Sequence, residues 1–424
     1  EIRKSLVGSE MCIRDSLTNM MRLHKNLVLA VLNGMQQIFN EEKYADKVVA
    51  QVLKSDKRWG SRDRGFIAET TYEIVRWKRL YAAIANVQEP LNRQDFWRIF
   101  AVWATLRGYV LPDWKPLEGT PTRRIKGKFE ELRQERKYRE SIPDWLDALG
   151  CKALGEKKWT LEMEALNTMA PVVLRANALK TLPKLLRNAL LEEKIKTQTL
   201  AKYPNALVLD ERANVFSTET FQRGWFEVQD ASSQSVAPFT QVAPGMRVID
   251  ACAGAGGKAL HLAAMMKNKG QLIALDIYQY KLRELKRRAK RAGAHNIETR
   301  HIDNNKVIKK LHGSADRVLL DAPCSGLGVL RRNPDAKWKL NPEFIDRVVL
   351  EQQQIVTQYA HMVKPGGKLV YVTCSILPQE NEEQIAAFME TEIGKEFTLE
   401  KEQHLWPAVN GFDGFYMARL LRKA

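Results

Sequence analysis

The stretch "RVIDACAGAGGK" at residues 247–258 decides how the second half of this chain folds. A short apolar strand pattern runs directly into a loop that contains Gly254, Gly256 and Gly257, and a helical pattern follows over residues 258–267. Glycines let the backbone approach a bound ligand closely, and the start of the helix offers unpaired N–H groups to an anionic group. Strand, glycine loop and helix in this order predict the first unit of a sheet that binds a ligand at the carboxyl ends of its strands.

The same alternation continues along the chain. Strand patterns lie at residues 272–276, 298–303, 317–322 and 368–374, and helix patterns lie at residues 278–293, 342–363 and 380–393. Alternating strands and helices predict a parallel, doubly wound sheet of the Rossmann-like α/β class.

The spacing of the loop argues against two common ligands. A phosphate-binding P-loop needs a glycine where the chain has Cys252 and a Ser or Thr where it has Ala259. The dinucleotide fingerprint G-x-G-x-x-G also fails at Ala259, although near variants exist. We therefore expect another adenosine-containing cofactor.

Two acids at strand ends support such a cofactor. Asp276 lies 22 positions after Gly254, where a carboxylate accepts hydrogen bonds from both hydroxyls of a ribose. Asp303 ends the next strand pattern and could reach the adenine edge. The competing interpretation of each acid is a helix N-cap.

Two cysteines follow the ends of two further strands. Cys324 lies three residues after Asp321, and Cys374 closes the fifth strand pattern. The fourth and fifth strands of such a sheet are neighbours, roughly 4.8 Å apart, so both thiols are expected to face one crevice.

One buried cysteine is usually inert, but two beside a cofactor suit methylation of cytosine C5. A thiolate adds to C6, C5 then attacks an electrophilic methyl, and the second thiol helps to release the enzyme. Asp321 near N3 would offset charge on the ring.

The charge of the chain predicts a polyanionic partner. Its 67 Lys and Arg against 50 Asp and Glu give a net charge of +17, for which a merely basic surface is the alternative. Residues 281–291 form a basic helix pattern that would flank RNA or lie in solvent. A second basic run would bind RNA phosphates and offer a stacking face or form a solvated loop; its residues are Arg331, Arg332, Lys337, Trp338 and Lys339.

Other features narrow the class of protein. No apolar run reaches the roughly 18 to 20 residues of a membrane span, and the five cysteines are scattered without a C-x-x-C pair. We expect no membrane partner, no metal, a cytoplasmic location and a monomer. The domains predicted are a helical bundle at residues 20–140, a small α+β module at 141–230 and the sheet domain at 231–424. Residues 1–19 look like a non-native leader.

Five motifs together resemble one known family. They are "VQDASSQ" at 228–234, "DACAGAGGK" at 250–258, "DAPCSG" at 321–326, "VTCS" at 372–375 and "DGFYMARL" at 413–420. This set resembles the RsmB/NOL1/NOP2/Sun family of S-adenosylmethionine-dependent RNA 5-methylcytosine methyltransferases, strongly from residue 141 onward. The N-terminal helices look like the NusB-like RNA-binding domain found in that family.

The resemblance implies a set of roles. Cys374 would be the nucleophile, Cys324 the release cysteine and Asp321 a further catalytic group. The sheet domain would have the class I methyltransferase fold and bind S-adenosyl-L-methionine. The cofactor-binding residues would be Cys252, Ala253, Gly254, Ala255, Gly256, Gly257, Lys258, Asp276, Asp303 and Asp321. The family usually has proline where this chain has Ala255, so the loop loses one fixed φ.

The sequence thus predicts methyl transfer to C5 of a cytosine in RNA, with 16S ribosomal RNA favoured by the resemblance. The base must leave its stack to reach the thiols, so the target is expected in a loop or in unfolded RNA. The alternatives are a non-catalytic RNA-binding ribosome assembly factor, a transfer RNA substrate, and a nicotinamide-dependent oxidoreductase. The last leaves both cysteines and the charge unexplained.

Overall fold

The computed structural model describes residues 22–424, so the predicted leader lies outside the described residues. The chain divides into two compact units. The helical unit holds the described residues up to Thr168 together with Leu330–Asn341, and the sheet unit holds Met169–Val329 and Pro342–Ala424. Between residues 22 and 424, every helix falls short of the length and apolar character that a membrane span requires.

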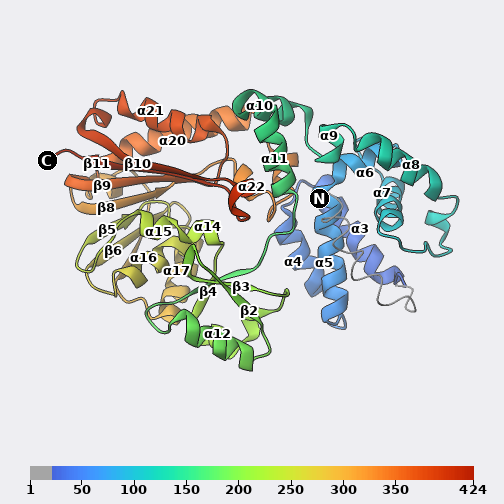
Figure 1. Ribbon diagram of the computed structural model, residues 1–424, viewed down its shortest axis with the longest axis horizontal. Helices are drawn as coiled ribbons and strands as arrows, with labels where there is room; N and C mark the ends of the chain where they lie inside the picture. Colours follow the sequence, from blue (N-terminus) through green and yellow to red (C-terminus); the bar gives the residue numbers. More distant parts are fainter. Residues whose placement is uncertain (1–21) are drawn as a thin grey trace. The chain divides into compact units, whose positions relative to one another are not determined.

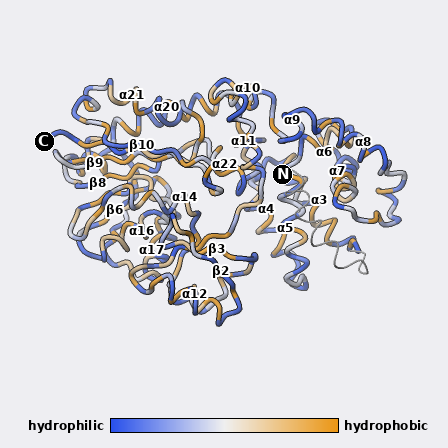
Figure 2. The backbone as a smooth tube through the Cα atoms, viewed as in Figure 1, coloured by the Kyte–Doolittle hydropathy of each residue, from blue (hydrophilic) through white to orange (hydrophobic). Residues whose placement is uncertain are grey.

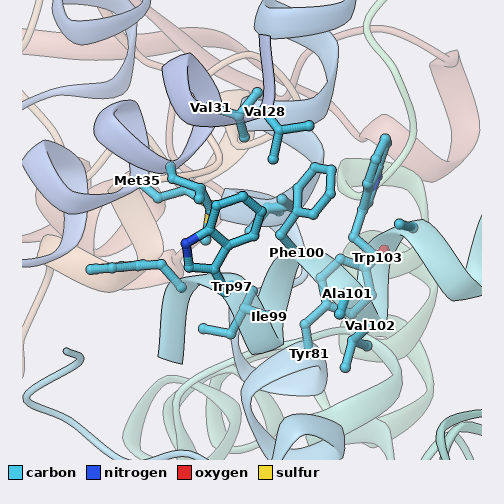
Figure 3. Close-up of a cluster of buried hydrophobic side chains, with 14 of the residues drawn as sticks. Val28, Val31, Met35, Tyr81, Trp97, Ile99, Phe100, Ala101, Val102 and Trp103 are labelled. Atoms are coloured by element: carbon cyan, nitrogen blue, oxygen red, sulfur yellow. The ribbon is translucent and has the colours of Figure 1, made fainter. Parts of the chain in front are cut away.

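The predicted helical bundle is confirmed in the helical unit. Its helices are α3 (Lys25–Phe39), α4 (Ala45–Ser55), α5 (Ser61–Arg76), α6 (Lys78–Ala85), α7 (Arg93–Leu106), α8 (Thr122–Leu132), α9 (Arg136–Arg139), α10 (Asp144–Leu154) and α11 (Glu156–Leu166). Helix α7 starts with a capping box, because the Asn92 side chain accepts from the N–H groups of Gln94 and Asp95. Figure 3 shows its Trp97, Phe100 and Trp103 in the core of this unit.

The basic run after Cys324 belongs to the core of the helical unit. Arg331 is 4% exposed and donates to the carbonyl of Ala165 at 2.7 Å, while Arg76 donates to the Arg331 carbonyl at 2.9 Å. Lys337 is 2% exposed and donates to the carbonyl of Glu140 at 3.3 Å. Burial holds the pKa of Lys337 well below its usual range.

The end of the same run, in the short helix α19 (Ala336–Lys339), is also tied to this unit. The Trp338 indole packs against the core and donates to the Val75 carbonyl at 2.7 Å. Lys339 donates to the Asp335 carboxylate and to the Lys43 carbonyl, each at 2.7 Å. The prediction that Arg331, Lys337 and Lys339 hold RNA phosphates is wrong, since their donors serve the protein interior. The predicted stacking face of Trp338 is wrong for the same reason.

The sheet unit contains a small antiparallel sheet with strand order β2-β3-β1-β4. Its elements are β1 (Val173–Ala176), α12 (Pro183–Glu192), β2 (Thr197–Leu200), β3 (Tyr203–Leu209) and β4 (Phe226–Val228). Leu186 and Leu190 of α12 pack against Leu174 and Leu207 of the sheet. The α+β character predicted for the module at residues 141–230 is therefore confirmed from Met169 onward, whereas residues 141–168 form α10 and α11 and belong to the helical unit.

The larger sheet has seven strands in the order β10-β11-β9-β8-β5-β6-β7. They are β5 (Arg247–Asp250), β6 (Gln271–Asp276), β7 (Ile297–His301), β8 (Ala315–Asp321), β9 (Val363–Thr373), β10 (Phe397–Leu405) and β11 (Phe415–Arg422). The five strands from β5 to β9 are parallel, which confirms the predicted doubly wound α/β fold. The antiparallel hairpin of β10 and β11 was not predicted.

Helices cover both faces of this sheet (Figure 1). Helices α20 (Pro342–Ala360) and α21 (Glu382–Met389) pack on one face. The other face carries α15 (Val236–Phe239), α16 (Gly257–Met265) and α17 (Gln279–Ala292). Figure 2 shows hydrophobic residues along β8 and β9, as expected for strands buried on both faces.

Candidate active site

The glycine loop joins β5 to α16 at the carboxyl edge of the sheet. Gly254 and Gly256 have φ values of +55° and +89°, a region that favours glycine. A Cβ at Gly256 would lie 2.6 Å from Leu285 Cγ, whereas a Cβ at Gly254 would meet nothing within 4 Å. Gly256 therefore serves packing as well as the turn, and Gly254 leaves open space above the loop.

Asp276 at the end of β6 holds this loop in place. Its carboxylate accepts from the N–H of Gly254 at 2.8 Å and from the N–H of Tyr278 at 2.7 Å. Each oxygen thus keeps a lone pair for a ligand. Asp303 lies two residues beyond β7, is exposed, and accepts from its neighbour Asn304. The structure brings Asp276 to the glycine loop and gives no such link for Asp303.

Two arginine side chains donate hydrogen bonds to backbone carbonyls of the glycine loop. Arg288 of α17 donates to the carbonyl of Ala255 at 2.8 Å, and Arg175 of β1 donates to the carbonyl of Gly257 at 2.8 Å. Cys252 contributes a buried thiol, and burial raises its pKa well above the usual range. The loop carbonyls at 255 and 257 are therefore already used, as are the N–H groups of Ala253, Gly254 and Gly256.

Asp250, the last residue of β5, was missed by the sequence analysis. It is fully buried, and neither carboxylate oxygen accepts a well-formed hydrogen bond from any described residue. Burial, together with the nearby Asp321 charge, raises the pKa of Asp250 to about 7. In the sequence, only one feature pointed to Asp250: it ends the strand pattern at residues 247–250.

Lys258 and Asp321 form an ion pair beside the loop, with Nζ and Oδ2 2.5 Å apart. Burial lowers the pKa of Lys258, but the Asp321 carboxylate outweighs it and raises this pKa. Lys258 comes from α16 and Asp321 from the end of β8. The ion pair therefore connects the glycine loop to the segment that leads to Cys324.

The two cysteines meet at the ends of neighbouring strands. Strands β8 and β9 are parallel, with Asp321 paired to Val372. The Sγ atoms of Cys324 and Cys374 lie 3.2 Å apart. The contact with Cys374, followed by burial, raises the pKa of the Cys324 thiol well above its usual range. The structure thus brings together the two thiols that the sequence separates by 50 residues.

A buried glutamate lies behind the cysteines and was also missed. The Glu380 carboxylate accepts from the Ser325 N–H at 2.7 Å, from the Ser325 hydroxyl at 2.5 Å and from the Ser375 hydroxyl. Burial raises the pKa of Glu380. The available signal was the repeated pattern C-S-x-L, at residues 324–327 and 374–377, which places a serine directly after each cysteine.

Two family models match the chain. Residues 239–421 match the 16S rRNA methyltransferase RsmB/F model, and residues 142–216 match the ferredoxin-like domain of RsmF/B-like methyltransferases. Among residues 22–424, no group of three or more His, Cys, Asp or Glu could hold a metal ion.

Several curated relatives carry the name ribosomal RNA small subunit methyltransferase B. A probable one from Synechocystis is 36% identical over 59% of this chain, and the match spans 56% of that relative. The Klebsiella pneumoniae relative is 35% identical over 68% of each chain. The Pectobacterium carotovorum relative is 32% identical over 92% of this chain and 100% of its own length.

Solved structures share the fold. The crystal structure of PH0851 has a TM-score of 0.80 at 24% identity and covers 95% of this chain and all of that one. A methyltransferase homolog protein from Pyrococcus horikoshii has a TM-score of 0.60 at 25% identity, over 68% of this chain and 97% of that one. With motifs, fold and relatives in agreement, the chain belongs to the RsmB/F family of 16S rRNA methyltransferases.

Proposed function

We propose that this protein transfers a methyl group from S-adenosyl-L-methionine to C5 of a cytosine in RNA. The observation that carries the proposal is the 3.2 Å approach of the Cys324 and Cys374 thiols at the edge where the glycine loop lies. One thiol can bond to C6 while the other stays within reach of the same ring. Direct hydride transfer to or from a nicotinamide would not require this pair.

The residues of the loop fit the proposed cofactor. Asp276 offers lone pairs to ribose hydroxyls, and Gly254 leaves open space for the nucleoside. Asp250 supplies a buried negative charge that a sulfonium or ammonium group would satisfy. When bound, the cofactor supplies an electrophilic methyl group. Residues 252–258 with Asp276 would hold it, and the contact of Asp303 with the adenine stays a prediction.

Each side chain of the site would then have its own role in the reaction. The Cys374 thiolate forms a bond to C6, and the electron pair of the C5=C6 bond makes C5 nucleophilic. After C5 has gained the methyl group, the Cys324 thiolate would take the C5 proton, the electron pair of the C5–H bond restores the C5=C6 bond, and the S–C6 bond breaks with its electron pair returning to the Cys374 sulfur. Cys324 assists this release. The Lys258 ion pair orients Asp321, whose carboxylate would face N3 of the base.

The RNA would follow a basic groove on the sheet unit, because the run at residues 331–339 is buried. The groove, of about 740 Å³, is lined by Lys180, Gln222, Arg223, Trp225, Arg287, Lys290 and Arg291. Helix α17 contributes three of these cations at helical spacing, and Trp225 offers an aromatic side chain. Such a lining suits a polyanionic strand.

The names of the relatives favour 16S ribosomal RNA over transfer RNA as the substrate. Since that RNA is found in the cytoplasm, we infer a cytoplasmic location. We infer a monomer, since one chain supplies both thiols and the cofactor loop. The target cytosine must be unstacked, so an unstructured or partly assembled ribosomal RNA is the expected substrate.

The decisive experiment traps the covalent intermediate. Cys324→Ala should accumulate a protein–RNA adduct that survives denaturing gels, because release is slowed after Cys374 has bonded to C6. Cys374→Ala should show no adduct and no transfer of tritium from labelled S-adenosylmethionine. Absence of both adduct and transfer with the wild-type protein, on varied unmodified RNAs, would favour a non-catalytic assembly factor instead.

A further inference from the structure

The two cysteine loops share a local design. Each begins at the end of a parallel strand and reads C-S-x-L, at residues 324–327 and 374–377. In each loop the serine hydroxyl accepts the N–H of the leucine two residues later, at 3.4 Å for Ser325 and 3.1 Å for Ser375. A hydroxyl that accepts in this way has its own proton free to donate elsewhere.

Both hydroxyl protons go to one carboxylate. Ser325 and Ser375 donate to the same Oε2 atom of Glu380, while Oε1 accepts from the Ser325 N–H at 2.7 Å and from Gln352 at 3.3 Å. Glu380 is fully buried, and its own carbonyl accepts from the Tyr371 hydroxyl at 2.8 Å. Gln352 also donates to the Pro323 carbonyl at 2.8 Å. The carboxylate therefore has four donors and a fixed backbone.

We propose that Glu380 is a positioning residue whose carboxylate helps to hold the nucleophile loop and the release loop in register, together with the contact of the Ser325 and Ser375 hydroxyls at 3.2 Å and the hydrogen bond from the Gly328 N–H to the Cys374 carbonyl at 2.8 Å. The inference rests on the proposed function, because it assigns the two loops to the two halves of that reaction. Glu380 itself is enclosed by the protein, and its carboxylate reaches the serine that follows each cysteine rather than the thiols; it acts through these serines.

The chemistry explains why a charged residue occupies this place. A buried carboxylate is costly unless every lone pair is satisfied, and an apolar side chain would fill the volume at lower cost. Hydrogen bonds to a charged acceptor are shorter and stronger than neutral ones. Groups that must act on one ring need their geometry held to about 0.5 Å. One acceptor shared by two loops fixes their separation more tightly than two independent contacts would.

The first test is Glu380→Gln, which keeps the shape but replaces one acceptor by an amide donor. With the amide oxygen at the Oε2 position, the new NH2 group faces the Ser325 N–H and the Gln352 amide; with the amide reversed, it faces both serine hydroxyls. We expect kcat for methyl transfer to fall by roughly 10- to 100-fold while KM for RNA changes little, because positioning acts on the reacting atoms. The matched control is Glu383→Gln, an exposed glutamate in the neighbouring helix, which should match the wild type.

The two serines separate positioning from mere stability. Ser375→Ala should slow adduct formation, because Ser375 adjoins the nucleophile. Ser325→Ala should leave adduct formation intact and slow release, so adduct accumulates as it does with Cys324→Ala. Glu380→Gln should slow both phases. A purely structural role would instead lower the melting temperature of all three variants and change both phases equally, and that result would overturn the inference.

An RNA-independent measurement keeps this inference separate from the proposed function. Phenylarsine oxide bonds to two thiols at once and so reports their separation. The wild type should bind it, Cys324→Ala should not, and Glu380→Gln should bind it at least tenfold more weakly. If Cys324→Ala accumulates no RNA adduct and the wild type transfers no methyl group, the proposed function fails while the arsenical still tests the positioning role. Unchanged arsenical affinity in Glu380→Gln would overturn that role.

Discussion

Two basic stretches of this chain look alike in sequence and have opposite fates in the structure. Residues 330–341 carry four basic residues and α17 carries seven, each against a single acid. In α17 the apolar residues Leu282, Leu285, Ala289 and Ala292 form one buried stripe, which leaves the other faces exposed. Residues 330–341 have no such stripe. Instead, Arg331 and Lys337 donate hydrogen bonds to backbone carbonyls, and Lys339 donates to the Asp335 carboxylate. Charge alone therefore does not distinguish an exposed basic surface from a buried basic segment; helical spacing of the apolar residues does.

The largest effect is expected where a buried cation is removed. Arg331→Ala should lower the free energy of unfolding of the helical unit by about 3 kcal/mol, because it removes buried hydrogen bonds to the Ala165 carbonyl and the Thr168 hydroxyl and creates a cavity. Denaturant unfolding followed by tryptophan fluorescence would measure it. Arg283→Ala in the exposed face of α17 serves as control and should change stability by less than about 0.5 kcal/mol. Equal losses in both variants would erase the contrast between the two stretches.

Lys337 allows the buried and the exposed basic stretches to be compared through the pH dependence of the free energy of unfolding. Burial lowers its pKa in the folded state, so between that pKa and the usual value near 10.5 the unfolded chain binds more protons. Stability then rises with pH over this window, by up to about 1.4 kcal/mol per pH unit. The unfolding free energy at pH 7, 8 and 9 should rise in the wild type, and Lys337→Met should abolish that contribution. The exposed control Lys286→Met should keep it; a wild-type slope in Lys337→Met would contradict the assignment.

The smallest effect concerns RNA. Arg287→Ala with Lys290→Ala should weaken RNA binding about tenfold at low salt and make the slope of log affinity against log salt shallower by about 1.4, since two phosphate contacts are lost. Filter binding or fluorescence anisotropy over a salt series measures both quantities. The matched pair Arg283→Ala with Lys286→Ala removes the same charge outside the groove lining. If both pairs weaken binding alike, RNA does not follow the groove.

The sequence could predict what depends on strand ends and periodicity. Asp276 and the two cysteines follow strand patterns, so parallel topology alone brings each to the ligand edge. Asp250 and Glu380 are both fully buried, and Glu380 also has hydrogen-bond partners from distant residues, which no local pattern reveals. The hairpin strand β10 was missed because Glu400, Lys401 and Glu402 interrupt its apolar alternation, and a register shift lies between Leu399 and Lys401. The burial of Arg331 and Lys337 was missed because their partners lie more than 160 residues away in the sequence.

The detour of residues 330–341 into the helical unit has a consequence for dissecting this enzyme. The polypeptide passes from one unit to the other after Val329 and returns at Pro342, in addition to the junction at Met169. A fragment that begins at Met169 would keep the detour, including Trp338, but lose the pocket that shelters it. The sheet unit therefore cannot be moved as an independent fragment. A truncation or replacement of the helical unit also requires a redesign of the loop that starts six residues after Cys324.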